Sequence, residues 1–382
     1  MNRSLCQATF LSITIFTAAF AQTPCTGTIT GTIVDDVLVD GVSCTIQGAI
    51  ITGSVQVING GTLNTTGATQ ISGSVSGMSS GDLRLQGTTS VLGDVSSESS
   101  PSSTIVVGSN AVLGKISLKD SGRVTVRGFV SAVLSENSGR VLVRGGTVGG
   151  GGIEAKLGSG NIVLCDANVT GSVGVIERAG NLLAEESSSC PKTTITGGIL
   201  IEKGNGDARV IGANFTSGDL SVVDQIGDVT ITSALLSDIG ISNLDGSVTL
   251  SMIETDSDVG LSGITGSVSV SSSAFSGDVG IEGSTSVSVT GSSFANESVS
   301  VITNAGPVEF SSNTELSLEI SENDDVTLTN NEIAIASISS NTGGVGIAGN
   351  TITELNCVDN MPPPVGSGNT ILLIATGQCA SF

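Results

Sequence analysis

Val248-Thr249-Leu250-Ser251 is followed 20 residues later by Val268-Ser269-Val270-Ser271, and 19 residues after that by Val287-Ser288-Val289-Thr290. In each segment apolar residues alternate with small polar ones, which is the pattern of a β-strand with one buried face. Similar segments continue through the C-terminal half, beginning at Val210, Val229, Val248, Val268, Val287, Val308, Val326 and Val345. A repeat of this length without helical periodicity predicts a stack of similar coils.

A second series keeps the same period, with apolar pairs at Leu220/Val222, Ile239/Ile241, Val259/Leu261, Val279/Ile281, Val299/Val301 and Leu318/Ile320. The N-terminal half repeats less regularly, at Cys44, Leu63, Leu83, Ile105, Val124, Val141, Ile162 and Leu182. The step from Leu182 to Val210 is 28 residues. We interpret the excess as a loop, Glu185–Pro191, that is inserted into one coil and pinned by Cys165.

One unit of this size cannot bury its own apolar face, but stacked units can. We therefore expect an all-β fold, a single-stranded parallel β-helix (β-solenoid) of about sixteen coils with disulfide-bonded terminal caps. Coils spaced by about 4.8 Å would make a rod roughly 75 Å long. Residues 22–382 are expected to form one continuous domain, with an N-terminal cap at 22–48 and a C-terminal cap at 356–382. A leucine-rich repeat or a β-sandwich fits the spacing less well.

Residues 1–21 resemble a secretory signal peptide. Arg3 precedes the apolar run Phe10–Phe16, and Ala19-Phe20-Ala21 provides a small-x-small cleavage site before Gln22. The apolar run is too short to span a bilayer of about 30 Å. The chain is therefore expected to be secreted and extracellular, with no membrane span.

Six cysteines remain after the signal peptide, an even number that suits an oxidising compartment. Their proximity in sequence suggests the pairs Cys25 with Cys44, Cys165 with Cys190, and Cys357 with Cys379, although fifteen pairings are open. The first and last pairs would close the two ends of the solenoid, whose unpaired strand edges would otherwise invite end-to-end pairing.

Composition excludes several classes of function. The 382 residues contain no His, Trp or Tyr, so histidine-based catalytic devices and imidazole metal sites are absent. A formal charge of −22 argues against nucleic acid as a partner. Lack of Tyr and Trp removes the usual sugar-stacking platforms. We expect a protein that is not an enzyme and has no cofactor other than Ca²⁺.

The two ends carry a family resemblance. Cys25-Thr26-Gly27-Thr28-Ile29, the stretch Cys44–Val55 and the closing segment Leu355–Cys379 resemble secreted, uncharacterised right-handed parallel β-helix (pectin-lyase-like) proteins found widely in bacteria. The chain departs from them at Ile371-Leu372-Leu373-Ile374, where a glycine-rich repeat would be expected. Pectate lyases share the architecture, but none of their catalytic residues can be carried over. In composition the chain is similar to acidic matrix proteins of calcified skeletons and shells.

Four aspartates precede the second series of strands: Asp219, Asp238, Asp258 and Asp278. In stacked coils they would form a column of carboxylates about 4.8 Å apart, and neighbouring charges at this distance repel unless a cation or proton intervenes. Oxygen-only ligands suit Ca²⁺. Two interpretations stay open, a weak cation or mineral site and simple turn capping.

Other repeated residues have structural explanations. Asn313, Asn331 and Asn350 predict an asparagine ladder, and Phe275 and Phe294 predict stacked core rings. A basic cluster, Lys115, Lys119, Arg123, Arg127, Arg140 and Arg144, is expected to offset acidic neighbours. Asn64, Asn168, Asn214 and Asn296 begin N-x-S/T triplets, which are glycan acceptors in a eukaryotic host.

These observations favour a secreted, non-catalytic extracellular matrix or surface scaffold, in which the acidic face binds Ca²⁺ or a mineral surface, as in a biomineralisation matrix. The alternative is a β-helix protein that binds or cleaves polysaccharide. The expected partners are accordingly extracellular matrix, a mineral or a polysaccharide surface.

Overall fold

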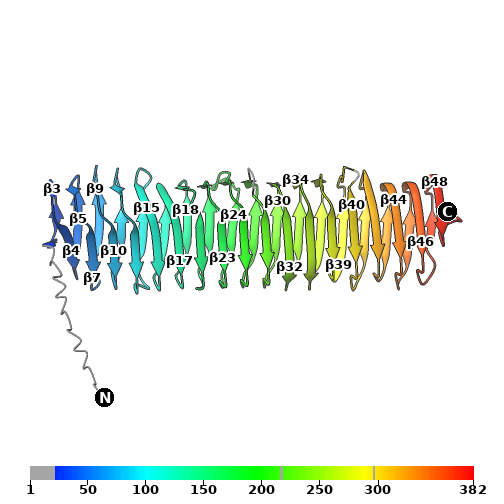
Figure 1. The fold of residues 1–382 in the computed structure, drawn as a ribbon, viewed down its shortest axis with the longest axis horizontal. Coiled ribbons are helices and arrows are strands. Elements are labelled where there is room, and N and C mark those ends of the chain that lie inside the picture. The colour runs from blue at the N-terminus through cyan, green and yellow to red at the C-terminus, as the bar shows by residue number, and fades with distance from the viewer. Residues whose placement is uncertain (1–21, 216–217, 296) are drawn as a thin grey trace, which may run out of the picture.

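The computed structural model describes residues 22–215, 218–295 and 297–382. Residues 1–21, which carry the expected signal peptide, lie outside this set. Within the described residues the protein is all-β, and its chain winds through about 17 turns into one straight rod (Figure 1). The predicted parallel β-solenoid is therefore confirmed. The described residues include no helix with the length and hydropathy needed to cross a bilayer.

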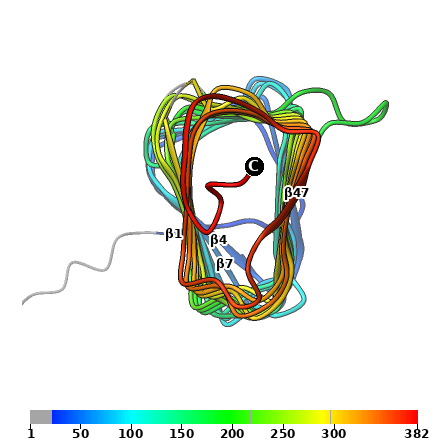
Figure 2. The same ribbon diagram turned by 90° about the vertical axis from the view of Figure 1, so that its right-hand side faces the viewer.

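The strands form three faces around the axis, and Figure 2 shows the two long faces on opposite sides of the rod. Face A consists of β1 (Gln22–Pro24), β4 (Asp36–Asp40), β7 (Val55–Ile58), β10 (Val75–Met78), β13 (Val95–Glu98), β15 (Val112–Lys119), β17 (Phe129–Glu136), β20 (Ile153–Lys156), β23 (Val173–Ile176), β26 (Ile199–Glu202), β29 (Leu220–Val223), β32 (Ile239–Leu244), β35 (Val259–Ile264), β38 (Val279–Glu282), β40 (Ser298–Ile302), β42 (Leu316–Ser321), β44 (Glu332–Ser339), β46 (Thr351–Val358) and β48 (Thr370–Gly377).

Face B consists of β2 (Thr28–Ile29), β5 (Ser43–Gln47), β8 (Thr62–Thr66), β11 (Leu83–Leu85), β14 (Thr104–Val107), β16 (Arg123–Val126), β18 (Val141–Arg144), β21 (Ile162–Cys165), β24 (Leu182–Glu185), β27 (Ala208–Ile211), β30 (Val229–Thr232), β33 (Val248–Ser251), β36 (Ser267–Ser271), β39 (Ser286–Thr290), β41 (Val308–Ser311), β43 (Val326–Thr329), β45 (Val345–Ala348) and β47 (Val365–Ser367).

Face C is built from two-residue strands: β3 (Thr32–Ile33), β6 (Ile50–Ile51), β9 (Gln70–Ile71), β12 (Ser90–Val91), β19 (Thr147–Val148), β22 (Asn168–Val169), β25 (Thr194–Ile195), β28 (Asn214–Phe215), β31 (Leu235–Leu236), β34 (Glu254–Thr255) and β37 (Ala274–Phe275). The longer strands β15 and β17 continue from face C into face A.

The register confirms the predicted series with one correction. All eight N-terminal anchors from Cys44 to Leu182 stand opposite one another in successive turns of face B. The next partner is Ala208, which pairs with both Leu182 and Val229, so Val210 was the wrong anchor by two residues. Alanine is small enough to be missed in a search for β-branched residues, although it occupies the same buried position.

The long step after Leu182 is a loop, as predicted. Ser187 and Cys190 form an isolated antiparallel bridge, and Cys190 is disulfide-bonded to Cys165 of the preceding turn. Viewed down the axis, this green loop stands out from the side of the rod (Figure 2). The strands on either side of the loop keep their pairing, so the insertion leaves the stack intact.

One continuous core fills the rod and extends from Cys25 to Cys379. Valine, isoleucine and leucine of successive turns are buried over one another, which gives each turn the apolar contacts that it could not make alone. Phe275 and Phe294 stack with ring centroids 5.1 Å apart, as predicted.

Polar groups inside the corners are paired from turn to turn. Asn313, Asn331 and Asn350 are buried, and the side-chain amide of Asn331 donates to Asn350 Oδ1 at 2.9 Å and to the carbonyl of Phe310 at 2.9 Å. This confirms the predicted ladder. A second ladder, which the sequence analysis missed, runs through Asn304, Asn323, Asn341 and Asn360.

All three predicted disulfides are present. Cys25–Cys44 joins the first two turns, and Cys357–Cys379 holds the last residues of the chain across the end of the final coil (Figure 2). There the ring of Phe382 lies over Gly366. These contacts cover the end of the apolar core.

We predict that Asn331→Ala lowers the free energy of unfolding by about 2–4 kcal/mol, because it leaves the buried carbonyl of Phe310 and the amide of Asn313 without their partners. Chemical denaturation would measure the change. Asn168→Ala, at an exposed position in β22, is the matched control and should change stability by less than about 0.5 kcal/mol. Equal effects of the two substitutions would contradict a stabilising ladder.

Candidate functional site

The middle of face A carries one short sequence three times: Asp238–Ser242, Asp258–Ser262 and Asp278–Glu282. Each stretch reads Asp, apolar, Gly, apolar, then Ser or Glu. Strand alternation buries the apolar residues and directs Asp, Gly and the final residue outward on β32, β35 and β38. The result is a polar surface that repeats once per turn.

The four predicted aspartates do form a column. Asp219, Asp238, Asp258 and Asp278 are exposed, and each precedes a residue of the in-register series Leu220, Ile239, Val259 and Val279. Spacing between turns of a parallel sheet is about 4.8 Å. Sequence reasoning therefore placed these side chains together correctly.

The structure confirms a capping role for two of these aspartates. Asp258 Oδ1 accepts the backbone N–H of Asp278 at 3.0 Å, and Asp278 Oδ1 accepts that of Ser298 at 3.0 Å. Asp36 caps Ser54 in the same way near the N-terminus, at 2.7 Å. Each of these hydrogen bonds uses one carboxylate oxygen.

The aspartates are spread one to a turn and do not converge on a single point. Within residues 22–215, 218–295 and 297–382 there is no group of three or more Asp, Glu or Cys side chains that could hold a metal ion. Any cation on this column would therefore be held by neighbouring carboxylates together with water, which is a weak and multivalent arrangement.

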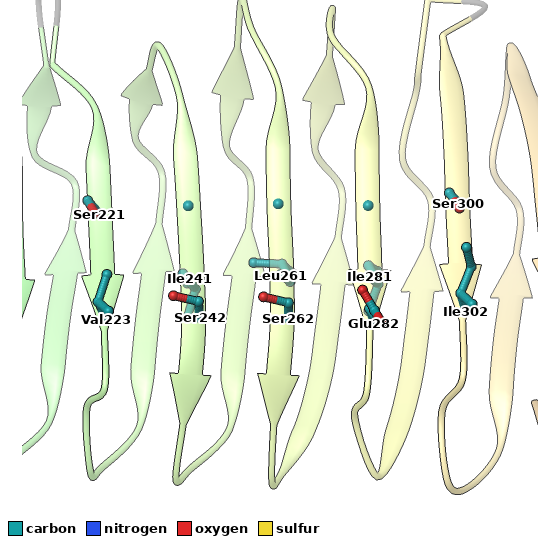
Figure 3. A pocket seen from close by; sticks show the side chains of 13 residues that line it. Ser221, Val223, Ile241, Ser242, Leu261, Ser262, Ile281, Glu282, Ser300 and Ile302 are labelled. Atoms are coloured by element: carbon teal, nitrogen blue, oxygen red, sulfur yellow. The ribbon is translucent and has the colours of Figure 1, made fainter.

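A shallow hollow of about 360 Å³ runs along the axis beside the aspartates (Figure 3). Its floor is the bare backbone of Gly240, Gly260 and Gly280, and Ser221 and Ser300 stand at its two ends. Ser242, Ser262 and Glu282 lie along one side of the glycines (Figure 3). A flat strip of peptide backbone is thus open between two columns of polar side chains.

These three glycines are not required by the fold. A Cβ atom added at Gly240, Gly260 or Gly280 would meet no atom within 4 Å, and none of the three has a positive φ. In contrast, a Cβ at Gly246 would lie 2.3 Å from the carbonyl oxygen of Gly227. Glycine inside a strand lowers stability by roughly 0.5–1 kcal/mol relative to alanine, so the strip carries a cost that packing does not explain.

The glycosylation predictions remain untested. Asn168 is exposed on face C, whereas Asn64 on face B and Asn214 on face C are half-buried. Asn296 lies outside the described residues. Exposure makes Asn168 the most accessible of the three described triplets.

Arg178 is a buried charge that sequence reasoning missed. It is 1% exposed and follows Glu177, whose backbone is left-handed. Its guanidinium donates to the carbonyls of Gly160 at 2.7 Å, Leu157 at 2.8 Å and Ser138 at 3.1 Å, and also to Gly139. Burial lowers the pKa of Arg178 from its usual value. It occupies the inward corner position that Ser138 fills two turns earlier, so its spacing was the available signal.

Comparison of the chain with protein-family models, curated proteins and solved structures finds no match. The functional argument therefore rests on the geometry of the rod itself.

We predict that the triple substitution of Gly240, Gly260 and Gly280 by alanine raises stability by about 0.5–1 kcal/mol per site, because the new methyl groups meet open space and restrict the unfolded chain. Denaturation midpoints would test this. Gly246→Ala serves as the control and should be destabilising, since its methyl group would overlap a backbone carbonyl. A loss of stability in the triple variant would show that the fold does need these glycines.

Proposed function

We propose that the protein is a secreted, non-catalytic extracellular scaffold whose acidic face A contacts Ca²⁺ or a calcium-bearing mineral surface. The observation that carries this proposal is the register of the turns, which repeats an exposed carboxylate at about 4.8 Å along a flat sheet. A rod of this kind presents one chemistry at regular intervals over many turns.

The build of the rod supports a scaffold role. Its shape depends on backbone ladders and a continuous apolar core, so it needs no ligand to hold its form. Three disulfides suit an oxidising compartment outside the cell. Both properties are useful to a protein that works in a matrix.

The acidic column suits an extended ionic surface better than a single chelated ion. Neighbouring carboxylates about 4.8 Å apart repel by roughly 3 kcal/mol at an effective dielectric of 20, and a divalent cation between them removes that repulsion. The caps at Asp258 and Asp278 use one oxygen of each carboxylate. The adjacent glycine strip has no side chains that would keep a flat surface away.

The alternative function, polysaccharide binding, would use a different part of the rod, the arginine-bearing strands of face B.

We predict that Ca²⁺ binds the wild-type protein with a Kd of about 1 mM, and that substitution of Asp219, Asp238, Asp258 and Asp278 by asparagine abolishes this binding. Asparagine keeps an oxygen that can cap the next turn, so the variant should fold while losing only charge. Isothermal titration calorimetry would measure the loss.

A second fourfold variant controls for net charge. It replaces four exposed aspartates outside the column, Asp40, Asp120, Asp166 and Asp359, by asparagine. This control should bind Ca²⁺ like the wild type. If the column variant binds Ca²⁺ unchanged, the aspartates serve only as caps.

A further inference from the structure

Four arginines form a rectangle on two neighbouring turns of face B. Arg123 begins β16, and Arg127 follows its last residue; Arg140 precedes β18, and Arg144 ends it. The pairing of Val124 with Val141 and of Val126 with Val143 sets Arg123 beside Arg140 and Arg127 beside Arg144. The two arginines of each pair belong to turns about 4.8 Å apart, and the pairs are separated by about 13 Å along the strands.

The rectangle has an open, flat centre. Thr125 and Leu142 are the outward residues between the two arginine pairs, and both are half-buried. The four arginines themselves are exposed. A ligand could therefore reach all four guanidinium groups from one side.

The expectation that this basic cluster offsets acidic neighbours holds only in part. Lys115 does pair with Asp94, at 3.6 Å, but on face A. None of the ion pairs in the described residues involves Arg123, Arg127, Arg140 or Arg144. Their one side-chain hydrogen bond in that set joins Arg123 Nε to Thr104 Oγ1 at 3.2 Å.

Other arginines of face B show what pairing looks like on this surface. Arg84 binds Asp82 at 2.8 Å, and Arg209 binds Glu185 at 2.8 Å. The chain has 35 acidic and only 13 basic residues, so acidic partners are abundant. Glu136 is the one acidic residue between Arg123 and Arg144, and it ends β17 on face A. The four guanidinium groups are thus left available to an external anion.

The geometry selects the kind of anion. Guanidinium groups bind sulfate and carboxylate oxygens through two parallel hydrogen bonds, with more directional specificity than lysine. Two pairs about 13 Å apart on a flat sheet suit repeated anionic groups on an extended chain better than one small ion in a pocket.

An exposed aromatic ring adjoins the rectangle. Phe129 is 40% exposed and lies two residues after Arg127, past the corner at Gly128. Its partner in the preceding turn, Val112, is 52% exposed. Phe215, Phe275, Phe294 and Phe310 are by contrast buried in the core. An exposed ring and its aliphatic neighbour form an apolar platform of the kind on which a sugar ring can pack.

We propose that Arg123, Arg127, Arg140 and Arg144, together with Phe129, form a binding site for an anionic polysaccharide that bears sulfate or carboxylate groups. This inference extends the proposed scaffold function by naming a matrix partner. It does not depend on Ca²⁺, and its experiments are run in the presence of a chelator, so either proposal can fail without the other.

The test uses the full-length secreted protein and measures binding to dextran sulfate, polygalacturonate and uncharged dextran of similar length. We expect the wild type to bind one or both charged polymers and not dextran, with affinity falling as salt rises. Preference between the two charged polymers distinguishes sulfate from carboxylate recognition. Arg127→Gln with Arg144→Gln should weaken binding roughly tenfold, and replacement of all four arginines by glutamine should abolish it.

The matched control is Arg84→Gln with Arg209→Gln, which changes net charge equally on the same face but removes arginines that are already paired. It should bind like the wild type. Equal losses in the control and in the Arg127/Arg144 variant would overturn the site, as would equal binding to charged and uncharged dextran.

Phe129→Ala tests whether the partner is a sugar polymer. It should weaken binding to the charged polysaccharide several-fold and leave binding to polyacrylate, which has no rings, unchanged. If polyacrylate binds as tightly as the polysaccharides, and Phe129→Ala affects neither, the site recognises charge alone and the polysaccharide assignment is wrong. Sedimentation velocity without polymer adds a third criterion: self-association that the fourfold arginine variant abolishes would identify a second copy of the acidic rod as the partner instead.

Discussion

Hydrogen bonds between each turn and the next run along the axis, and they determine where every other group lies. Because the ladders are parallel and in register, a residue on one turn stands beside the residue about 19 positions later. Inward positions become columns of valine, isoleucine and leucine, and outward positions become columns of one surface chemistry. The aspartates, the glycine strip and the paired arginines are all products of this one constraint.

The corners are where the ladder is most difficult to satisfy. Many corner residues other than glycine have a left-handed backbone, among them Asn330, Ser340 and Asp359. The residue that follows turns inward and must find hydrogen-bond partners without water. Asparagine solves this in the C-terminal half by bonding both to the next asparagine and to a carbonyl of an earlier turn. Arg178 provides a second solution, in which one guanidinium serves several carbonyls.

Most of the fold could be predicted from the sequence because the period is set by large β-branched residues. The prediction was wrong where a small residue filled a core position, as Ala208 does in place of Val210. The ladder through Asn304 and Asn341 has the same spacing as the one that was predicted, but serine and glycine occupy its position in other turns and obscure the column.

The candidate sites were predicted less completely. Spacing alone brought the four aspartates together, because they precede strands that are in register. It did not indicate which basic residues remain unpaired, since ion pairs such as Arg84 with Asp82 depend on side-chain conformation. Nor did it separate Phe129 from the buried phenylalanines, because the exposure of a ring depends on the corner beside it. Periodicity reports which face a residue occupies, and charge balance has to be read from the assembled surface.

The loop that carries Cys190 has a consequence for how such a rod can change. It leaves the stack at one corner and returns, while the strands on either side stay paired. Extra sequence at a corner therefore adds a side branch without lengthening or bending the shaft. A protein built in this way can acquire new appendages one corner at a time, with each addition judged on its own merits because the shaft beneath it is undisturbed.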